Sequence, residues 1–254
     1  MSKRDRETEE RVFGILQRTY GLMGNFVHNR GTEPGEGNGE PDFTVDHDGG
    51  RLGVEITCIH IPGKVGGMPL QQHEAEKDEI VERAREKAVQ FGLPPLKVDV
   101  IFTGNPPKKK NRKTNWADTL FEIVRSNCPE PGHITYLGGM DSDLPEGFHW
   151  IGINRSLKWR KNSWSCEDEA GDVETDFSAQ LQERIDAKAS KLPQYRKCCD
   201  KCWLVIAALG RRPSSFFEYT DEMTTRRYRS PFEGVLFVDV ASGTVNELSI
   251  IEAA

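Results

Sequence analysis

Two carboxylates, Asp42 and Glu55, are the residues best suited to carry out chemistry. They belong to two short apolar runs, residues 41–45 and 52–57, which a polar turn of Asp and Gly residues separates. β-Branched runs joined by such a turn predict a hairpin. Alternate side chains of a strand share a face, so we expect Glu55 and Thr57 on one side and their neighbours in the core.

Carboxylates brought together across a hairpin offer the oxygen ligands that Mg²⁺ prefers. We therefore predict a Mg²⁺ site, which Mn²⁺ could also occupy, with Asp42 and Glu55 as ligands. The main-chain carbonyl of Ile56 is a further candidate ligand, because it lies between two residues that face the site. The alternative is an ordinary hairpin with two exposed acids.

The sequence Pro-Asp-Phe, a turn, and then Val-Glu-Ile-Thr resembles the active-site hairpin of the PD-(D/E)xK nuclease superfamily. The resemblance implies a restriction-endonuclease-like fold in which Asp42 and Glu55 hold Mg²⁺ for phosphodiester hydrolysis. The superfamily has a Lys two residues after the second acid, which orients the attacking water. Here Thr57 occupies that position, so the resemblance implies either a lysine supplied from elsewhere or an inactive site.

A first helix is predicted over residues 8–22, and Glu9 falls within its apolar stripe. An acid on a core-facing stripe is costly unless it is paired or bound to metal. In the superfamily an acid of the first helix often reaches the metal, and Glu9 fits that role, with Glu10 beside it. Alternatively, Glu9 is a first-turn acid that the helix dipole favours.

The missing lysine has a candidate in a second helix, predicted over residues 177–197. Lys188 falls within about 20° of Phe177 on the helical wheel, inside the apolar face. It either extends its ammonium to solvent or meets a buried carboxylate. Because several branches of the superfamily place the lysine on this helix, the resemblance implies that Lys188 substitutes for it, with Lys191 and Lys77 as rivals.

A basic run follows residue 105 and predicts either contacts with nucleic-acid phosphates or a solvated loop. A helix with Asn115 as its N-cap is predicted directly after it. Residues 158–161, Lys-Trp-Arg-Lys, are typical of a nucleic-acid clamp or of a loop anchored by tryptophans. The predicted phosphate-binding residues of the basic run are Lys108, Lys109, Lys110, Arg112 and Lys113.

Composition limits the remaining possibilities. The 254 residues are 36% hydrophobic and 29% charged, with no apolar run long enough for a transmembrane helix and no signal peptide, so we expect a cytoplasmic protein without membrane contact. The net charge of −6 excludes a generally basic nucleic-acid coat but not a local basic face. The CxxC at residues 199–202 has no second pair, so we expect reduced thiols rather than zinc.

Together these observations predict one α/β domain of restriction-endonuclease type over residues 1–254, with a mixed central sheet flanked by helices. Its core would comprise residues 8–103 and 177–209, with an insertion at 104–176 and a C-terminal extension at 210–254 that ends in a β-hairpin. The predicted function is metal-dependent hydrolysis of nucleic acid, with DNA favoured over RNA, an endonuclease favoured, and a homodimer possible. The alternatives are an inactive nuclease-like scaffold that binds nucleic acid or a protein, and an unrelated α/β binding protein.

Overall fold

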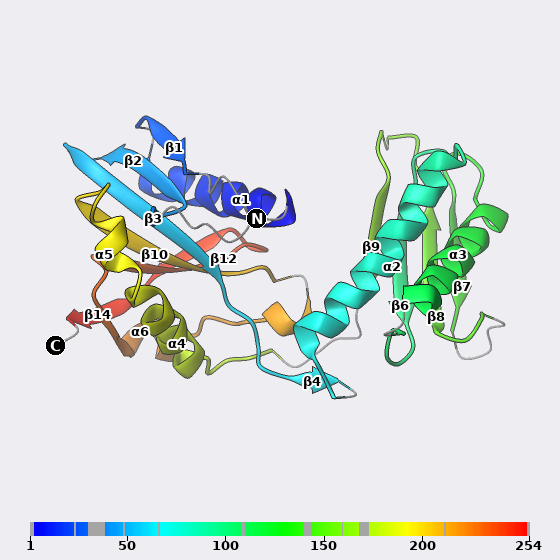
Figure 1. Ribbon diagram of the computed structural model, residues 1–254. Helices are drawn as coiled ribbons and strands as arrows, with labels where there is room; N and C mark the ends of the chain where they lie inside the picture. The colour runs from blue at the N-terminus through cyan, green and yellow to red at the C-terminus, as the bar shows by residue number, and fades with distance from the viewer. Residues whose placement is uncertain are drawn as a thin grey trace. The chain divides into compact units, whose positions relative to one another are not determined.

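The computed structural model shows two compact units, and each is described by itself (Figure 1). Unit 1 comprises Met1–Ile61 and Asp172–Ala254, and unit 2 comprises Pro62–Gly171. In the part of the chain that the structure describes, no helix has the length and apolarity that crossing a membrane requires. The described residues are 3–22, 24–29, 39–47, 49–65, 67–107, 110–139, 144–158, 160–167, 173–210 and 212–252.

Unit 1 is built on a six-stranded mixed sheet with the order β1-β2-β3-β10-β12-β13. Strands β3, β10 and β12 are parallel to one another, whereas β1, β2 and β13 pair antiparallel with their neighbours. The predicted α/β class and mixed sheet are therefore confirmed. The strands are β1 (Phe26–His28), β2 (Phe43–His47), β3 (Gly50–Cys58), β10 (Lys201–Ala208), β12 (Gly234–Asp239) and β13 (Thr244–Glu247).

Helices cover both faces of this sheet (Figure 1). Helix α1 (Lys3–Tyr20) packs apolar side chains such as Phe13 and Leu16 on one face. Helices α4 (Ser178–Ala189) and α5 (Leu192–Tyr195) cover the other face. The apolar run of β10 at residues 202–208 follows from this arrangement, because a strand covered on both faces buries side chains on both sides.

The helix predicted over residues 177–197 is in fact two helices, α4 and α5. Pro193 has no N–H to donate to the carbonyl of Ala189, and its ring would clash with that carbonyl in a continuous helix. The chain therefore turns after Ala189 and begins α5 at Leu192.

The C-terminal region completes unit 1. The predicted hairpin is β12 and β13, and β12 pairs with β10, so the hairpin extends the sheet as expected. A separate parallel pair joins β11 (Arg227–Ser230) and β14 (Ser249–Glu252). Two short helices, η1 (Pro213–Ser215) and α6 (Asp221–Thr225), connect β10 to β11.

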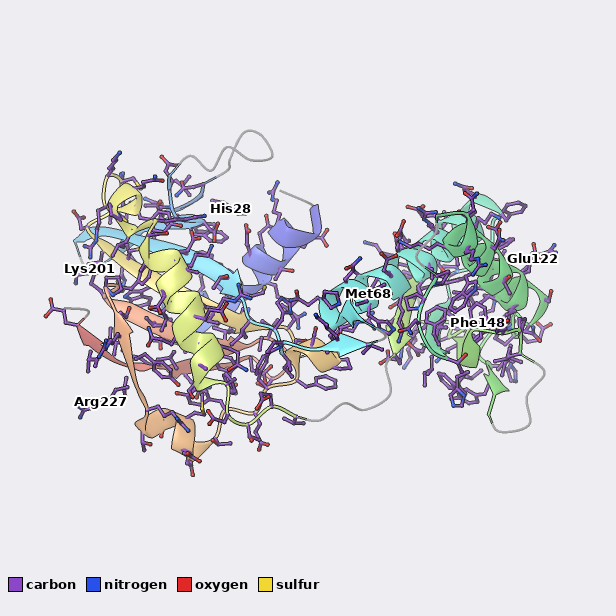
Figure 2. The ribbon with its side chains drawn as sticks, turned by 60° about the horizontal axis from the view of Figure 1, so that its bottom comes forward. His28, Met68, Glu122, Phe148, Lys201 and Arg227 are labelled. Carbon is purple, nitrogen blue, oxygen red and sulfur yellow. The ribbon has the colours of Figure 1, made fainter. Side chains whose placement is uncertain are left out.

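Unit 2 is a four-stranded sheet with the order β7-β8-β6-β9, with helices α2 and α3 on one face (Figure 1). A short antiparallel pair, β4 and β5, precedes α2. The side chains of this unit are drawn in Figure 2 around the labelled residues Glu122 and Phe148. The elements are β4 (Lys64–Val65), β5 (Met68–Pro69), α2 (Leu70–Gln90), β6 (Lys97–Phe102), α3 (Lys110–Ser126), β7 (Ile134–Gly138), β8 (Phe148–Asn154) and β9 (Ser163–Glu167).

Two sequence-based boundaries differ from the structure. Helix α2 and strand β6 were assigned to the nuclease-like core, but both belong to unit 2, which begins at Pro62 rather than at residue 104. In β6 buried and partly exposed residues alternate, as in a strand whose sheet has helices on only one face. Helix α3 begins at Lys110, so Asn115 lies inside the helix and is not its N-cap.

Candidate functional site

The predicted hairpin forms, and it brings Asp42 to the centre of strand β3. Strands β2 and β3 pair antiparallel with Phe43 opposite Val54. Asp42 directly precedes β2, and its Oδ2 accepts a hydrogen bond of 2.7 Å from the backbone N–H of Ile56. The carboxylate of Asp42 is thereby held next to the part of β3 that carries Glu55.

Glu55 is the buried acid of this site, with 4% of its surface exposed. Its Oε1 accepts a 2.5 Å hydrogen bond from the ammonium of Lys188 on α4, 133 positions further along the chain. The hydroxyl of Tyr195 on α5 also donates a hydrogen bond to Glu55. A buried carboxylate without hydrogen-bond donors strongly destabilises the fold. Helices α4 and α5 supply the donors that stabilise the buried carboxylate of Glu55.

The electrostatics of the site are dominated by crowded negative charge. Burial and the neighbouring carboxylate of Glu55 raise the pKa of Asp42 from 3.8 to about 7, and Glu9 adds to the effect. The N–H of Ile56 and the ammonium of Lys188 act in the opposite direction. Burial, together with the charge of Glu55, also raises the pKa of Tyr195, so its hydroxyl stays protonated. A cation placed among these carboxylates would relieve their repulsion.

Glu9 of α1 reaches this cluster through a histidine that the sequence analysis did not select. The Nε2 of His28 on β1 lies 3.0 Å from Oε2 of Glu9, and both side chains are mostly buried. The His28 ring also stacks on Phe43, with ring centroids 4.3 Å apart. The carboxylate of Glu10 lies 3.7 Å from the other ring nitrogen. His28 thus fixes the side chain of Glu9 beside the β2–β3 hairpin.

The structure therefore assembles four predicted residues, Asp42, Glu55, Lys188 and Glu9, at one place in unit 1. Thr57 lies two residues after Glu55 on the same strand and is partly buried. Of the rival lysines, Lys191 is exposed after α4, and Lys77 is buried within α2 of unit 2. Only Lys188 among the three is shown to contact Glu55.

The donor set suits Mg²⁺ better than a metal that needs a complete protein cage. Among the residues described by the structure, no group of three or more His, Cys, Asp or Glu side chains is arranged to hold a metal ion. Mg²⁺ commonly binds through one or two carboxylates and takes its other ligands from water and substrate phosphates. Asp42 and Glu55, with the Ile56 carbonyl, match that pattern chemically.

The predicted phosphate-binding run is only partly described. Lys108 and Lys109 lie outside the described residues, as does the side chain of Lys110 at the start of α3. Arg112 is exposed. Lys113 is buried and forms ion pairs with carboxylates of α2, those of Glu76 and Glu79. The expectation that Lys113 contacts phosphates is therefore wrong, because its charge is already neutralised inside unit 2.

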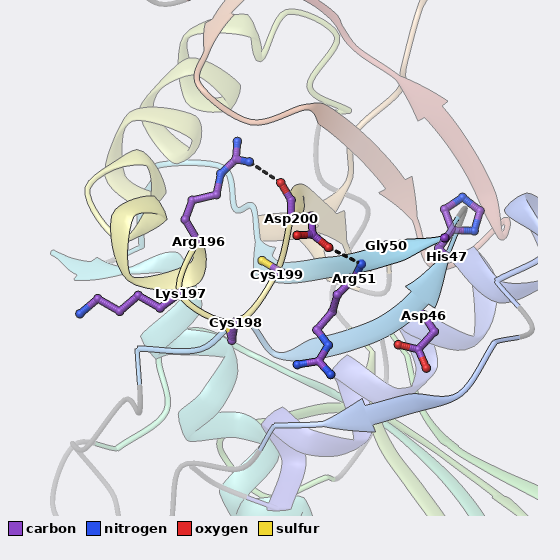
Figure 3. Close-up of a pocket in the computed structure, with 10 residues that line it drawn as sticks. Asp46, His47, Gly50, Arg51, Arg196, Lys197, Cys198, Cys199 and Asp200 are labelled. Carbon is purple, nitrogen blue, oxygen red and sulfur yellow. Dashed lines mark hydrogen bonds between the residues drawn. The ribbon is translucent and has the colours of Figure 1, made fainter.

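A surface pocket of unit 1 lies elsewhere (Figure 3). It has a volume of about 680 Å³ and lies at the start of β3, where Arg51 donates its N–H to Asp200 at 2.7 Å. Glu55 is four residues further along the strand, roughly 13 Å away at 3.3 Å per residue. Cys198 and Cys199 line this pocket, and their thiols donate to the Tyr195 carbonyl.

Comparisons with protein-family models, with curated proteins and with solved structures found no match. The expectation of a PD-(D/E)xK nuclease therefore depends on the sequence motif alone.

Proposed function

We propose that unit 1 is a divalent-cation-dependent nuclease that hydrolyses phosphodiester bonds in nucleic acid, with DNA as the favoured substrate. The observation that carries this proposal is the meeting of two carboxylates of one hairpin with an ammonium from a distant part of the chain. The carboxylates of Asp42 and Glu55 lie together on a hairpin, and the ammonium of Lys188 lies 2.5 Å from Glu55. Burying charged groups lowers the stability of the fold, and clusters of buried charge are found most often at active sites, where they serve catalysis.

Each residue has a role consistent with its position. Asp42 and Glu55, with the Ile56 carbonyl, would hold Mg²⁺ or Mn²⁺. A cation bound there supplies Lewis-acid polarisation of the phosphate and a bound water of lowered pKa. Lys188 would orient the attacking water or balance charge on the phosphate oxygens in the transition state. Lys188 thus takes the role of the motif lysine, whose position in this chain is occupied by Thr57.

Glu9, His28 and Tyr195 support these groups. Glu9 lies close enough to raise the pKa of Asp42, so it would add negative charge to the cation site. His28 is a positioning residue that holds Glu9 by the 3.0 Å contact. Tyr195 donates to Glu55 and thereby shares that carboxylate with Lys188. These contacts fix the site before substrate arrives, which limits the reorganisation that catalysis requires.

Cleavage of supercoiled plasmid and of single-stranded DNA in Mg²⁺ or Mn²⁺ tests the proposal. We expect Asp42→Asn and Glu55→Gln to reduce cleavage to background. Asp200→Asn is the matched control, because Asp200 also accepts a 2.7 Å hydrogen bond from a β3 N–H but lies at the other end of the strand. Cleavage that survives Glu55→Gln would contradict the assignment of the site.

The role of Lys188 is tested by Lys188→Ala, with Lys191→Ala as its exposed neighbour on the same segment. We expect the first substitution to lower the cleavage rate by about 10²-fold or more and the second to leave it unchanged. The second candidate function is an inactive scaffold that binds nucleic acid or a protein. The ion pair between Lys188 and Glu55 favours it, because Lys188 balances the charge of Glu55 without a metal ion. Folded wild-type protein that binds DNA identically with and without Mg²⁺, and cleaves none, would support the scaffold.

A further inference from the structure

The sheet of unit 2 has one face that no helix covers among the described residues. Helices α2 and α3 pack on the side chains of Val98, Val100, Ile151 and Ile153. The alternate residues of the same strands point to the opposite face, because side chains alternate along a strand. That open face carries Ile134, Tyr136, Trp150, Gly152, Asn154, Lys97, Asp99, Ile101, Ser163, Ser165 and Glu167.

Two aromatic rings, one exposed and one partly exposed, lie together on this open face. Tyr136 of β7 is 65% exposed and stacks on Trp150 of β8, with ring centroids 5.7 Å apart and planes inclined by 25°. A Cβ atom at Gly152 would lie 2.6 Å from the Trp150 ring, so glycine at this position lets the ring lie against its own strand. An exposed aromatic surface of this kind is where an unpaired base stacks.

One end of the open face is strongly basic. The segment 155–162 joins the end of β8 to the start of β9, and it contains four cationic residues and no acid. Lys158, Arg160 and Lys161 are all exposed. The same end of the sheet carries Lys97. Such a cluster of cations, next to a stacking surface, complements the phosphates of a strand whose bases lie on the sheet.

The acids of the open face do not cancel this basic end. Asp99 forms an ion pair of 2.9 Å with Lys97 and accepts a 2.7 Å hydrogen bond from Ser165. Glu167 lies at the opposite end of β9 from residues 155–162. At this end of the sheet the three exposed cations of the segment outnumber the one acid of the adjoining α3–β7 loop, the exposed Glu130.

We propose that the open face of unit 2 binds single-stranded nucleic acid, with bases stacked on Tyr136 and Trp150 and phosphates contacting Lys158, Arg160 and Lys161. The choice of nucleic acid as ligand rests on the proposed nuclease function of unit 1. The open face adds to that function a preference for an unpaired strand. The stacking surface carries no feature that selects a base sequence, so binding is expected to tolerate many sequences.

Fluorescence anisotropy with a labelled dT20 oligonucleotide and a 20-base-pair duplex, in EDTA, tests this binding in the full chain. We expect dT20 to bind more tightly than the duplex. Tyr136→Ala should weaken dT20 binding at least fivefold, whereas Tyr136→Phe should retain it because the ring remains. Ile134→Ala is the matched control, since it truncates an exposed apolar side chain of the same strand without removing a ring.

Salt dependence tests the cationic residues. The triple substitution of Lys158, Arg160 and Lys161 to Ala should reduce the slope of log affinity against log salt by about 2, because each phosphate contact to a single strand contributes about 0.7. Arg125→Ala, which removes an exposed cation of α3, should leave the slope unchanged. A dT20 affinity unaffected by Tyr136→Ala, tighter binding of the duplex, or no binding by the wild type would overturn the proposal.

The test separates this proposal from that for unit 1. Glu55→Gln should abolish cleavage and leave dT20 binding intact. Absence of cleavage together with Tyr136-dependent binding would refute only the nuclease, and cleavage with Tyr136-independent binding would refute only the open face.

Discussion

Replacing Asp42 by Asn isolates the effect of the crowded carboxylates on stability. The amide is similar in size and retains an oxygen that can accept the Ile56 N–H, so the substitution removes mainly the charge. In the folded protein the pKa of Asp42 is about 7, above its ordinary value of 3.8. The folded state therefore binds the proton more tightly than the unfolded chain does. The free energy of unfolding must fall as pH rises from about 4 to about 7 and then level off.

The size of this fall follows from the pKa difference. At 1.36 kcal/mol per pKa unit, a rise from 3.8 to about 7 sets an upper limit of about 4 kcal/mol. Side chains and water reorganise around a buried charge, so we expect about 1–3 kcal/mol. Asp42→Asn should therefore be more stable than the wild type by that amount at pH 8 and of nearly equal stability at pH 4. For a chain of this size the gain corresponds to roughly 3–10 °C in Tm.

The assay is thermal unfolding of wild type, Asp42→Asn and Asp200→Asn in EDTA at pH 4 and pH 8. Asp200 is exposed and lies away from the acid cluster, so Asp200→Asn should give no gain at pH 8. Adding Mg²⁺ at pH 8 should raise the Tm of the wild type and leave that of Asp42→Asn unchanged, because a ligand stabilises only the state that binds it. A stability difference that is the same at both pH values would refute the electrostatic argument.

Three further substitutions test other parts of the fold. Lys113→Met removes a buried cation from two carboxylates of α2 and should destabilise unit 2 by about 3–5 kcal/mol in urea unfolding; an unchanged midpoint would mean that the ion pairs contribute nothing. Phe13→Ala removes the ring that stacks on Phe43 at 4.1 Å and should cost about 3–5 kcal/mol of unit 1 stability, also measured in urea. Tyr195→Phe removes a donor to Glu55 and should lower the free energy of unfolding by about 1–3 kcal/mol; equal stability would show that water replaces the hydroxyl.

The local pattern of the sequence was sufficient to predict the hairpin and the position of Lys188. Alternation of apolar residues predicted that the carboxylates of Asp42 and Glu55 meet, and the helical wheel predicted a lysine on the buried face of α4. His28 was missed because a three-residue strand carries no periodic signal. Tyr195 was missed because an aromatic residue on an apolar stripe is usually a core residue, and Pro193 changes the direction of the chain before it.

Long-range pairing was not predictable from local patterns. The sequence of β6 alternates like any strand with one buried face, and nothing within it says which sheet it joins. Lys113 was expected in solvent because it ends a basic run. Its partner carboxylates lie on α2, more than thirty positions earlier, and only the packing of α2 against α3 brings them together.

The insertion of unit 2 between β3 and β10 determines when the proposed site can form during synthesis. Strand β3 ends at Cys58, whereas its parallel neighbour β10 begins at Lys201. At typical translation rates, the intervening stretch of about 140 residues takes roughly 7–30 s to synthesise. Throughout that interval the β2–β3 hairpin lacks its central neighbour, and Glu55 lacks its donors until Lys188 and Tyr195 are made near the end of the interval. Unit 1 can therefore complete its fold only after the ribosome has made unit 2, and any activity of the site is delayed until then.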